Sequence, residues 1–218
     1  MIVVNFKTYE QATGEKAVAL AAICKKIADE MKLRIVAAPQ LADLRACAQT
    51  GVECWAQHTD AVEVGRHTGY VLLESVMAAG GKGTLLNHSE HKMTWEGLKE
   101  ALVRIDNKIE VCVCAVDLVE CQRVATLQPK YVAYEPVEFI GNKNLSVASE
   151  RGDVIKQVVE VLTGMPIIIG AGVHSAEDVK VGLGFGAKGV LVATDVVLAE
   201  NPEKELRELA RAFTPMAG

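Results

Sequence analysis

The sequence predicts an α/β protein, a closed (β/α)8 barrel formed as a single domain by residues 1–218. Eight short apolar runs recur along the chain, and most are continuous rather than alternating with polar residues, which is typical of parallel strands buried on both faces. Amphipathic segments lie between the runs, and no linker rich in Pro, Gly or Ser divides the chain. An open, doubly wound sheet of eight strands is the alternative, but the strand number and even spacing favour the closed barrel.

The predicted strands are built mainly from Val, Ile, Leu, Cys and Ala. In chain order they cover residues 2–6, 34–38, 53–57, 84–87, 111–116, 131–135, 166–170 and 189–193. Between them, the spacing predicts helices over 15–31, 94–105, 117–127, 151–162, 175–183 and 202–213, with weaker patterns at 41–50 and 72–79.

Several helix starts carry their own signal. Thr94 is an N-cap candidate. Ser175, with Asp178 three residues later, resembles a capping box. Pro202 stands where the first turn of a helix tolerates proline. These signals agree with the apolar periodicity that follows each of them.

Composition excludes several classes of protein. Half of the residues are hydrophobic and 23% are charged, so the chain is not intrinsically disordered. The net charge is −5 and no dense Lys/Arg run occurs, which argues against nucleic-acid binding. No apolar stretch is long enough to span a membrane, and Asn5, Lys7 and Glu10 interrupt the region where a signal peptide would be apolar. We therefore expect a cytoplasmic protein.

The six cysteines predict buried thiols rather than a metal site. A chain of this size does not need a disulfide framework. Cys112 and Cys114 form a C-x-C pair inside an apolar run, and neither a second pair nor a nearby histidine completes a zinc set. We expect no metal and six reduced cysteines, mostly in the core.

Candidate catalytic groups follow the predicted strands, where the chemistry of such barrels is found. Lys7 follows the first strand, His88 the fourth and Glu135 the sixth, where Pro136 prevents a helix from starting. A Gly-x-Gly turn at residues 170–172 follows the seventh strand and could approach an anion through backbone N–H groups. Together these groups suit proton abstraction beside a carbonyl on a small phosphorylated substrate.

A set of motifs in the same order along the chain resembles the triosephosphate isomerase family, in its short archaeal form, which has the TIM-barrel fold. The matching segments are Asn5-Phe6-Lys7-Thr8-Tyr9, Gln57-His58, Ala61-Val62-Glu63 with His67-Thr68-Gly69, Asn87-His88-Ser89-Glu90, Ala133-Tyr134-Glu135-Pro136, Ile140-Gly141, Gly170-Ala171-Gly172-Val173 and Gly189-Val190-Leu191-Val192-Ala193.

The resemblance implies a role for each strand-end residue. Glu135 would be the base that moves a proton between the adjacent carbons of glyceraldehyde 3-phosphate and dihydroxyacetone phosphate in glycolysis and gluconeogenesis. His88 would be a neutral electrophile, with a helix opening at Ser89-Glu90 disfavouring its charged form. Lys7 would add positive charge near the oxyanion, Asn5 would orient the substrate, and Glu90 would place Lys7 or the loop.

The resemblance also implies a phosphate site, made with Asn5 and Lys7 by the segments Ile140-Gly141, Gly172 and Ala193-Thr194. It implies no metal and no organic cofactor. Residues 136–146 would form a lid over the site. The loop at His67-Thr68-Gly69 would insert beside a neighbouring subunit, so a homo-oligomer is implied, a tetramer in preference to a dimer.

Two departures from the family pattern leave alternatives open. Asp195 introduces a carboxylate near the expected phosphate, and residues 142–144 change the hinge of the lid. We expect the Asp195 side chain to turn away and cap a short helical turn that begins around Val196. The alternatives are another phosphate-binding barrel acting on indole or imidazole ribotides, which His88 with Glu135 argues against, and a catalytically impaired homologue that binds phosphometabolites or serves as a scaffold.

Overall fold

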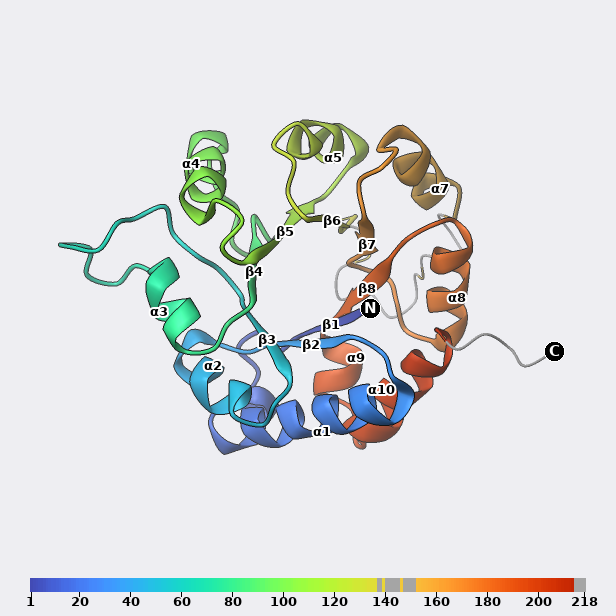
Figure 1. Ribbon diagram of the computed structural model, residues 1–218. Helices are drawn as coiled ribbons and strands as arrows, with labels where there is room; N and C mark the ends of the chain where they lie inside the picture. The colour runs from blue at the N-terminus through green and yellow to red at the C-terminus, as the bar shows by residue number, and fades with distance from the viewer. Residues whose placement is uncertain (137–138, 140–145, 147–151, 214–218) are drawn as a thin grey trace.

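A computed structural model shows a closed barrel of eight parallel strands surrounded by helices (Figure 1). The structure describes residues 1–136, 139, 146 and 152–213. The strands are paired in chain order, and β1 closes the ring against β8 through pairs such as Val3 with Leu191. The predicted (β/α)8 barrel is therefore confirmed. None of the described helices is both long enough and apolar enough to cross a bilayer.

The strands are short, and all but one end one residue before the predicted boundary. They are β1 (Ile2–Asn5), β2 (Ile35–Ala38), β3 (Glu53–Ala56), β4 (Gly83–Leu86), β5 (Glu110–Ala115), β6 (Tyr131–Tyr134), β7 (Ile167–Ile169) and β8 (Gly189–Val192). The residue just past β6, Glu135, still donates its N–H to the Ala115 carbonyl of β5 at 2.8 Å, and its side chain lines the cavity at the mouth of the barrel.

The helices agree closely with the predicted ranges. They are η1 (Glu10–Ala12), α1 (Glu15–Met31), α2 (Leu41–Ala48), α3 (Leu73–Ala78), α4 (Trp95–Ile105), α5 (Leu118–Ala125), α7 (Gly152–Val161), α8 (Ala176–Gly184), α9 (Thr194–Val197) and α10 (Pro202–Arg211). Thr94 and Ser175 are N-caps whose hydroxyls accept backbone N–H groups, and Pro202 opens α10, as predicted.

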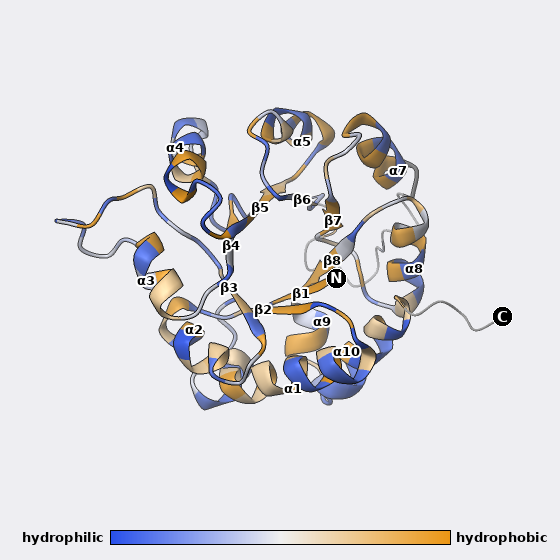
Figure 2. Cartoon of the chain, viewed as in Figure 1, coloured by the Kyte–Doolittle hydropathy of each residue, from blue (hydrophilic) through white to orange (hydrophobic). Residues whose placement is uncertain are grey.

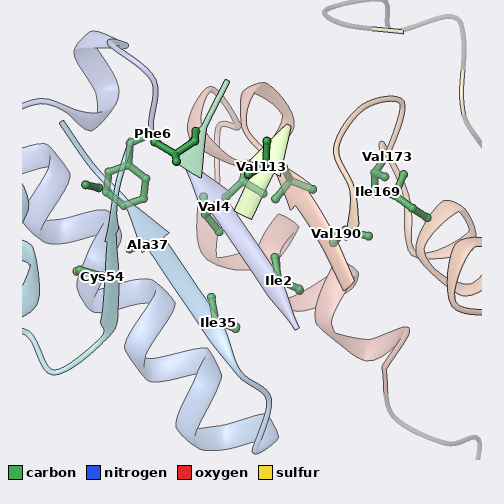
Figure 3. Close-up of a cluster of buried hydrophobic side chains, with 14 of the residues drawn as sticks. Ile2, Val4, Phe6, Ile35, Ala37, Cys54, Val113, Ile169, Val173 and Val190 are labelled. Carbon is green, nitrogen blue, oxygen red and sulfur yellow. The ribbon is translucent and has the colours of Figure 1, made fainter. Parts of the chain in front are cut away.

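Burial on both faces explains the continuous apolar runs. Ile2 and Val4 point outward, where they pack with other strand residues under the helices (Figure 3). Val3, between them, belongs to a second cluster that fills the barrel interior with Trp55, Cys112 and other side chains. Polar residues lie on the outer helices while the strands are mostly apolar (Figure 2). All six cysteines are buried free thiols, as predicted.

The amino end of the barrel is packed shut. Trp55 is fully buried, and its Nε1 donates to Glu53 Oε1 at 2.9 Å. Gly83 lies against this ring, since a Cβ atom there would come within 2.6 Å of it. The Arg34 guanidinium stands 5.8 Å from the centroid of the Trp55 ring and binds both Glu53 and Glu110 at 2.6 Å. This leaves the opposite, carboxyl end of the barrel for a ligand.

Candidate active site

A cavity opens at the carboxyl end of the strands. Its walls bring together, from five different strand ends, most of the residues predicted from the sequence. They include Asn5, Lys7, His88, Glu135, Gly170, Gly172, Ala193 and Thr194. The predicted Ile140 and Gly141, with the rest of the expected lid apart from Pro136, Phe139 and Ser146, lie outside the described residues.

Lys7 is fixed at the mouth of β1 by three contacts. Its backbone is left-handed, with φ of 47°, and its N–H donates to Asn5 Oδ1 at 2.9 Å. Gln57 Nε2 donates to the Lys7 carbonyl at 3.0 Å. The ammonium group binds Glu90 Oε1 at 2.7 Å. Glu90 and Asn5 therefore hold Lys7 on the wall of the cavity.

The geometry around His88 assigns its tautomer. The Glu90 backbone N–H donates to His88 Nδ1 at 3.2 Å, so in the neutral ring Nδ1 is the acceptor and Nε2 carries the proton. Nε2 faces Glu135 Oε1 at 3.5 Å. Burial lowers the pKa of His88, opposed by the Glu90 carboxylate and reinforced by the Lys7 and Lys92 ammonium groups. These causes favour a neutral imidazole that presents an N–H donor to the cavity.

The helix expected after His88 is absent from its predicted place. Residues Ser89 and Glu90 form a turn, and α4 begins only at Trp95, capped by Thr94. The prediction that a helix dipole disfavours the imidazolium was therefore wrong. Burial and the N–H that Glu90 donates to Nδ1 instead favour the neutral ring of His88. Both depend on how the loop after β4 folds back toward β1 and β6.

Glu135 is a carboxyl group held in an apolar, enclosed position. Its side chain is 1% exposed, and neither oxygen has a hydrogen-bond partner in the described part of the chain. Burial raises its pKa to about 7, although the Cys114 thiol, the Ser89 backbone N–H and Lys7 favour the charged form. A carboxyl with a pKa near neutrality can accept and return a proton.

Gly170 makes room for Glu135. A Cβ atom on Gly170 would lie 2.4 Å from the Glu135 Cγ atom, well inside van der Waals contact. The glycine therefore lets the seventh strand end pass directly beside the carboxyl group, which gives this residue a function separate from the predicted anion turn.

A network behind the site was missed by the sequence analysis. Asn87, left-handed with φ of 58°, donates through Nδ2 to the Cys114 carbonyl and to Glu120 Oε1, both at 2.9 Å. Glu120 also binds Lys92 at 2.7 Å and accepts the Val116 N–H at 2.8 Å. This network joins the loops after β4 and β5, and so supports the turn that carries His88. The sequence could not predict this network, because a left-handed backbone at Asn87 has no periodic pattern and Glu120 has the sequence context of an ordinary helix residue.

The other end of the cavity has the features of an anion site. Ala193 is the N-cap of the four-residue α9, which begins at Thr194, so the first N–H groups of this turn have no partner within the helix. The Thr194 hydroxyl lies 3.0 Å from the Tyr9 hydroxyl. Gly172, on the neighbouring strand end, is left-handed with φ of 69°. The predicted residues Gly172, Ala193 and Thr194 therefore line one wall.

The prediction for Asp195 was wrong. The carboxylate does not cap a turn at Val196, because α9 begins two residues earlier, at Thr194, and Asp195 is inside its first turn. Its Oδ2 instead lies 2.8 Å from Nδ1 of His174, in the loop after β7. Both side chains line the cavity.

Comparison with known proteins agrees with this geometry. A family profile described as triosephosphate isomerase matches residues 1–212. The chain belongs to the triosephosphate isomerase family. It is 39% identical over 215 residues to the triosephosphate isomerase of Methanothermus fervidus, with 96% of both chains covered. It is 36% identical to that of Methanocaldococcus jannaschii, covering 97% of this chain and 99% of the relative. The predicted family and enzyme class are both confirmed.

Within the described residues, no group of three or more His, Cys, Asp or Glu side chains is arranged to hold a metal ion. The side chains that the family resemblance singles out are instead one ammonium, one imidazole and one carboxyl around a common space. That set is suited to moving a proton and stabilising an oxyanion.

Proposed function

We propose that the protein interconverts D-glyceraldehyde 3-phosphate and dihydroxyacetone phosphate through an enediolate intermediate. The observation that carries this proposal is the pairing of Glu135 with His88. A nearly buried carboxyl of raised pKa lies 3.5 Å from an imidazole N–H, and both groups line one cavity. Membership of the triosephosphate isomerase family supports the choice of substrate.

In this mechanism Glu135 removes a proton from the carbon beside the substrate carbonyl. The electron pair of the broken C–H bond forms the carbon–carbon double bond, and the carbonyl oxygen becomes the enediolate oxygen. The hydroxyl proton of the intermediate moves to the former carbonyl oxygen, which leaves the negative charge on the other oxygen. As that oxygen becomes the new carbonyl, the Glu135 carboxylic acid returns its proton to the former carbonyl carbon. The carbonyl itself makes the transferred proton acidic, so the step needs no metal or organic cofactor.

His88 and Lys7 stabilise the charge that develops on oxygen. His88 donates its Nε2–H to the substrate oxygens, and the neutral ring does so without losing a proton to the enediolate. Lys7 adds a fixed positive charge, and Asn5 orients both Lys7 and the substrate. The N–H groups of Gly172, Ala193 and Thr194 receive the phosphate, together with Ile140 and Gly141 of the expected lid at 136–146.

The test is a coupled assay of triose phosphate interconversion on the parent chain and on two variants. Glu135→Gln should lower kcat at least about 100-fold, because it removes the proton acceptor. Glu135→Asp should also be slow, because it withdraws the carboxylate by one methylene from the reacting carbon. Glu177→Gln, an exposed carboxylate on α8, is the matched control. A parent-like kcat in both Glu135 variants would refute the assignment. The impaired homologue is not favoured, since Glu135, His88 and Lys7 share one cavity.

We also propose that the active form is a homo-oligomer. The segment between β3 and α3 extends away from the barrel (Figure 1), and residues 63–70 are all exposed. Val64 and Tyr70 on this segment are 73% and 57% exposed, so the segment presents two large apolar side chains to a partner. A groove beside the active site, which includes Thr8 and His91, offers a place for the same loop of a second copy.

A tetramer remains our expectation, and two exposed valines on adjacent helices, Val103 on α4 and Val119 on α5, offer a further apolar surface. Thr68→Glu should give smaller species and lower activity together, measured by light scattering and the coupled assay. Thr163→Glu, in the turn after α7, is the control. A fully active parent monomer would contradict the proposal. We expect the protein to work in the cytoplasm, where six free thiols remain reduced.

A further inference from the structure

A hydrogen-bonded histidine–aspartate pair lies at the phosphate end of the cavity. His174, in the loop after β7, places Nδ1 2.8 Å from Oδ2 of Asp195 in the first turn of α9. Both side chains line the same cavity as Lys7, His88 and Glu135, and both are about three-quarters buried. Because an ionised carboxylate only accepts hydrogen bonds, Nδ1 of His174 carries the proton in this contact.

The surroundings of this pair are acidic. Asp178 Oδ2 accepts the His174 backbone N–H at 3.1 Å, so a second carboxylate lies beside the loop that carries His174. Glu205 of α10 has a pKa raised by burial and further by Glu208 and Asp195, which puts another carboxyl within electrostatic reach of Asp195. Lys7, which follows the neighbouring strand β1, is already paired with Glu90. A phosphate dianion at the start of α9 would meet a surplus of negative charge.

Coulomb's law gives the effect of the Asp195 carboxylate on phosphate binding. A bare carboxylate ~6 Å from one unit of phosphate charge, at an effective dielectric constant of about 20, would weaken binding by about two orders of magnitude. A hydrogen bond from an imidazole spreads the carboxylate's charge and fixes the oxygen that carries it.

We propose that His174 is a positioning residue for the phosphate of the substrate. Its Nδ1–H holds the Asp195 carboxylate and offsets its charge, so that the N–H groups at the start of α9 remain available to the dianion. The inference rests on the proposed function for the identity of the phosphate ester. On this inference, a carboxylate at position 195 is compatible with phosphate binding only when His174 is present.

The experiment is a double-variant cycle on the full chain. We expect His174→Ala to raise KM for glyceraldehyde 3-phosphate at least tenfold while kcat stays within threefold, because the chemistry at Glu135 and His88 is untouched. Asp195→Asn keeps an acceptor for His174 and should lower KM two- to threefold. In His174→Ala/Asp195→Asn, KM should return to within threefold of the parent, since the uncompensated charge is gone.

A second readout does not depend on turnover. Titration calorimetry with glycerol 3-phosphate, an unreactive phosphate ester, should give Kd values that follow the same pattern as KM in the four proteins. His174→Gln, whose amide can still donate to Asp195, should weaken binding less than His174→Ala. The exposed Glu177→Gln is the control for a general loss of negative charge and should leave Kd unchanged.

Two results would overturn the inference. In one, His174→Ala leaves KM and Kd unchanged. In the other, the double variant is as weak as His174→Ala, which would assign His174 a purely structural role in the β7 loop. Failure of the proposed function gives a different pattern, in which the parent does not isomerise triose phosphates. If glycerol 3-phosphate binding still follows the cycle, the inference stands without that reaction.

Discussion

Replacing Glu135, the proposed base, with glutamine should raise the stability of the folded protein at the neutral to alkaline pH at which Glu135 is ionised. Glu135 is 1% exposed, and the cost of removing its ionised form from water outweighs the stabilisation of that form by the Cys114 thiol, the Ser89 backbone N–H and Lys7. Glutamine has nearly the same shape and does not ionise. The substitution therefore isolates the free energy of holding this charge in the barrel.

The magnitude follows from the pKa. The folded state raises the pKa of Glu135 from 4.5 to about 7, so it binds this proton more tightly than the unfolded chain does. At about 1.4 kcal/mol per pH unit, the shift corresponds to about 3 kcal/mol. The sign is the reverse of that for a salt-bridged carboxylate. The stabilisation is present below pH 4.5 and is lost as the pH rises through about 7.

The assay is urea denaturation of the parent and of Glu135→Gln at pH 4.5 and pH 8. All measurements use one protomer concentration, because the stability of an oligomer depends on the protomer concentration. The stability of Glu135→Gln relative to the parent should be about 3 kcal/mol greater at pH 8 than at pH 4.5. Glu177→Gln, exposed on α8, should show no such difference. A difference for Glu135→Gln that does not change with pH would refute the argument that burial raises this pKa.

Three further predictions test other parts of the site and fold. His88 should give nitrogen NMR signals of a neutral ring protonated at Nε2 throughout roughly pH 5 to 8, and an imidazolium at neutral pH would contradict its assignment. Gly170→Ala should lower kcat at least about tenfold with a smaller change in KM, because the new Cβ displaces the Glu135 side chain; a parent-like kcat in the coupled assay would exclude that contact. Gly83→Ala should destabilise the fold by about 1–3 kcal/mol in urea denaturation, because its Cβ overlaps the Trp55 ring; an unchanged midpoint would show that the ring moves freely.

Local patterns in the sequence were sufficient for the elements and for most of the site. Continuous apolar runs predict strands buried on both faces, and the two-residue pleat then fixes which side chains point inward. Ala133 belongs to the interior cluster, so Glu135, two residues later, faces the same way at the mouth. Because all strands of the barrel run parallel, their carboxyl ends meet at one rim, and the family motifs identify the groups there.

Loop conformation was predicted less well, because it depends on contacts that are distant in sequence. The turn after His88 reads as a helix start, yet α4 begins at Trp95. Its actual course is held by Asn87, which reaches Glu120, a residue 33 positions away in the chain. No local propensity encodes such a contact, since it exists only once β4 and β5 are paired.

The sequence by itself determined the barrel, the order of its strands and the presence of one carboxyl, one imidazole and one ammonium group at its carboxyl rim. Only the tertiary structure decided how these groups are charged and what neutralises them. The pKa of Glu135 depends on its removal from water, and Asp195 meets His174, 21 positions away, only when β7 and β8 pair. The physical reason is that backbone preference and apolar periodicity are local properties, whereas desolvation and electrostatic pairing depend on which distant segments the fold brings into contact.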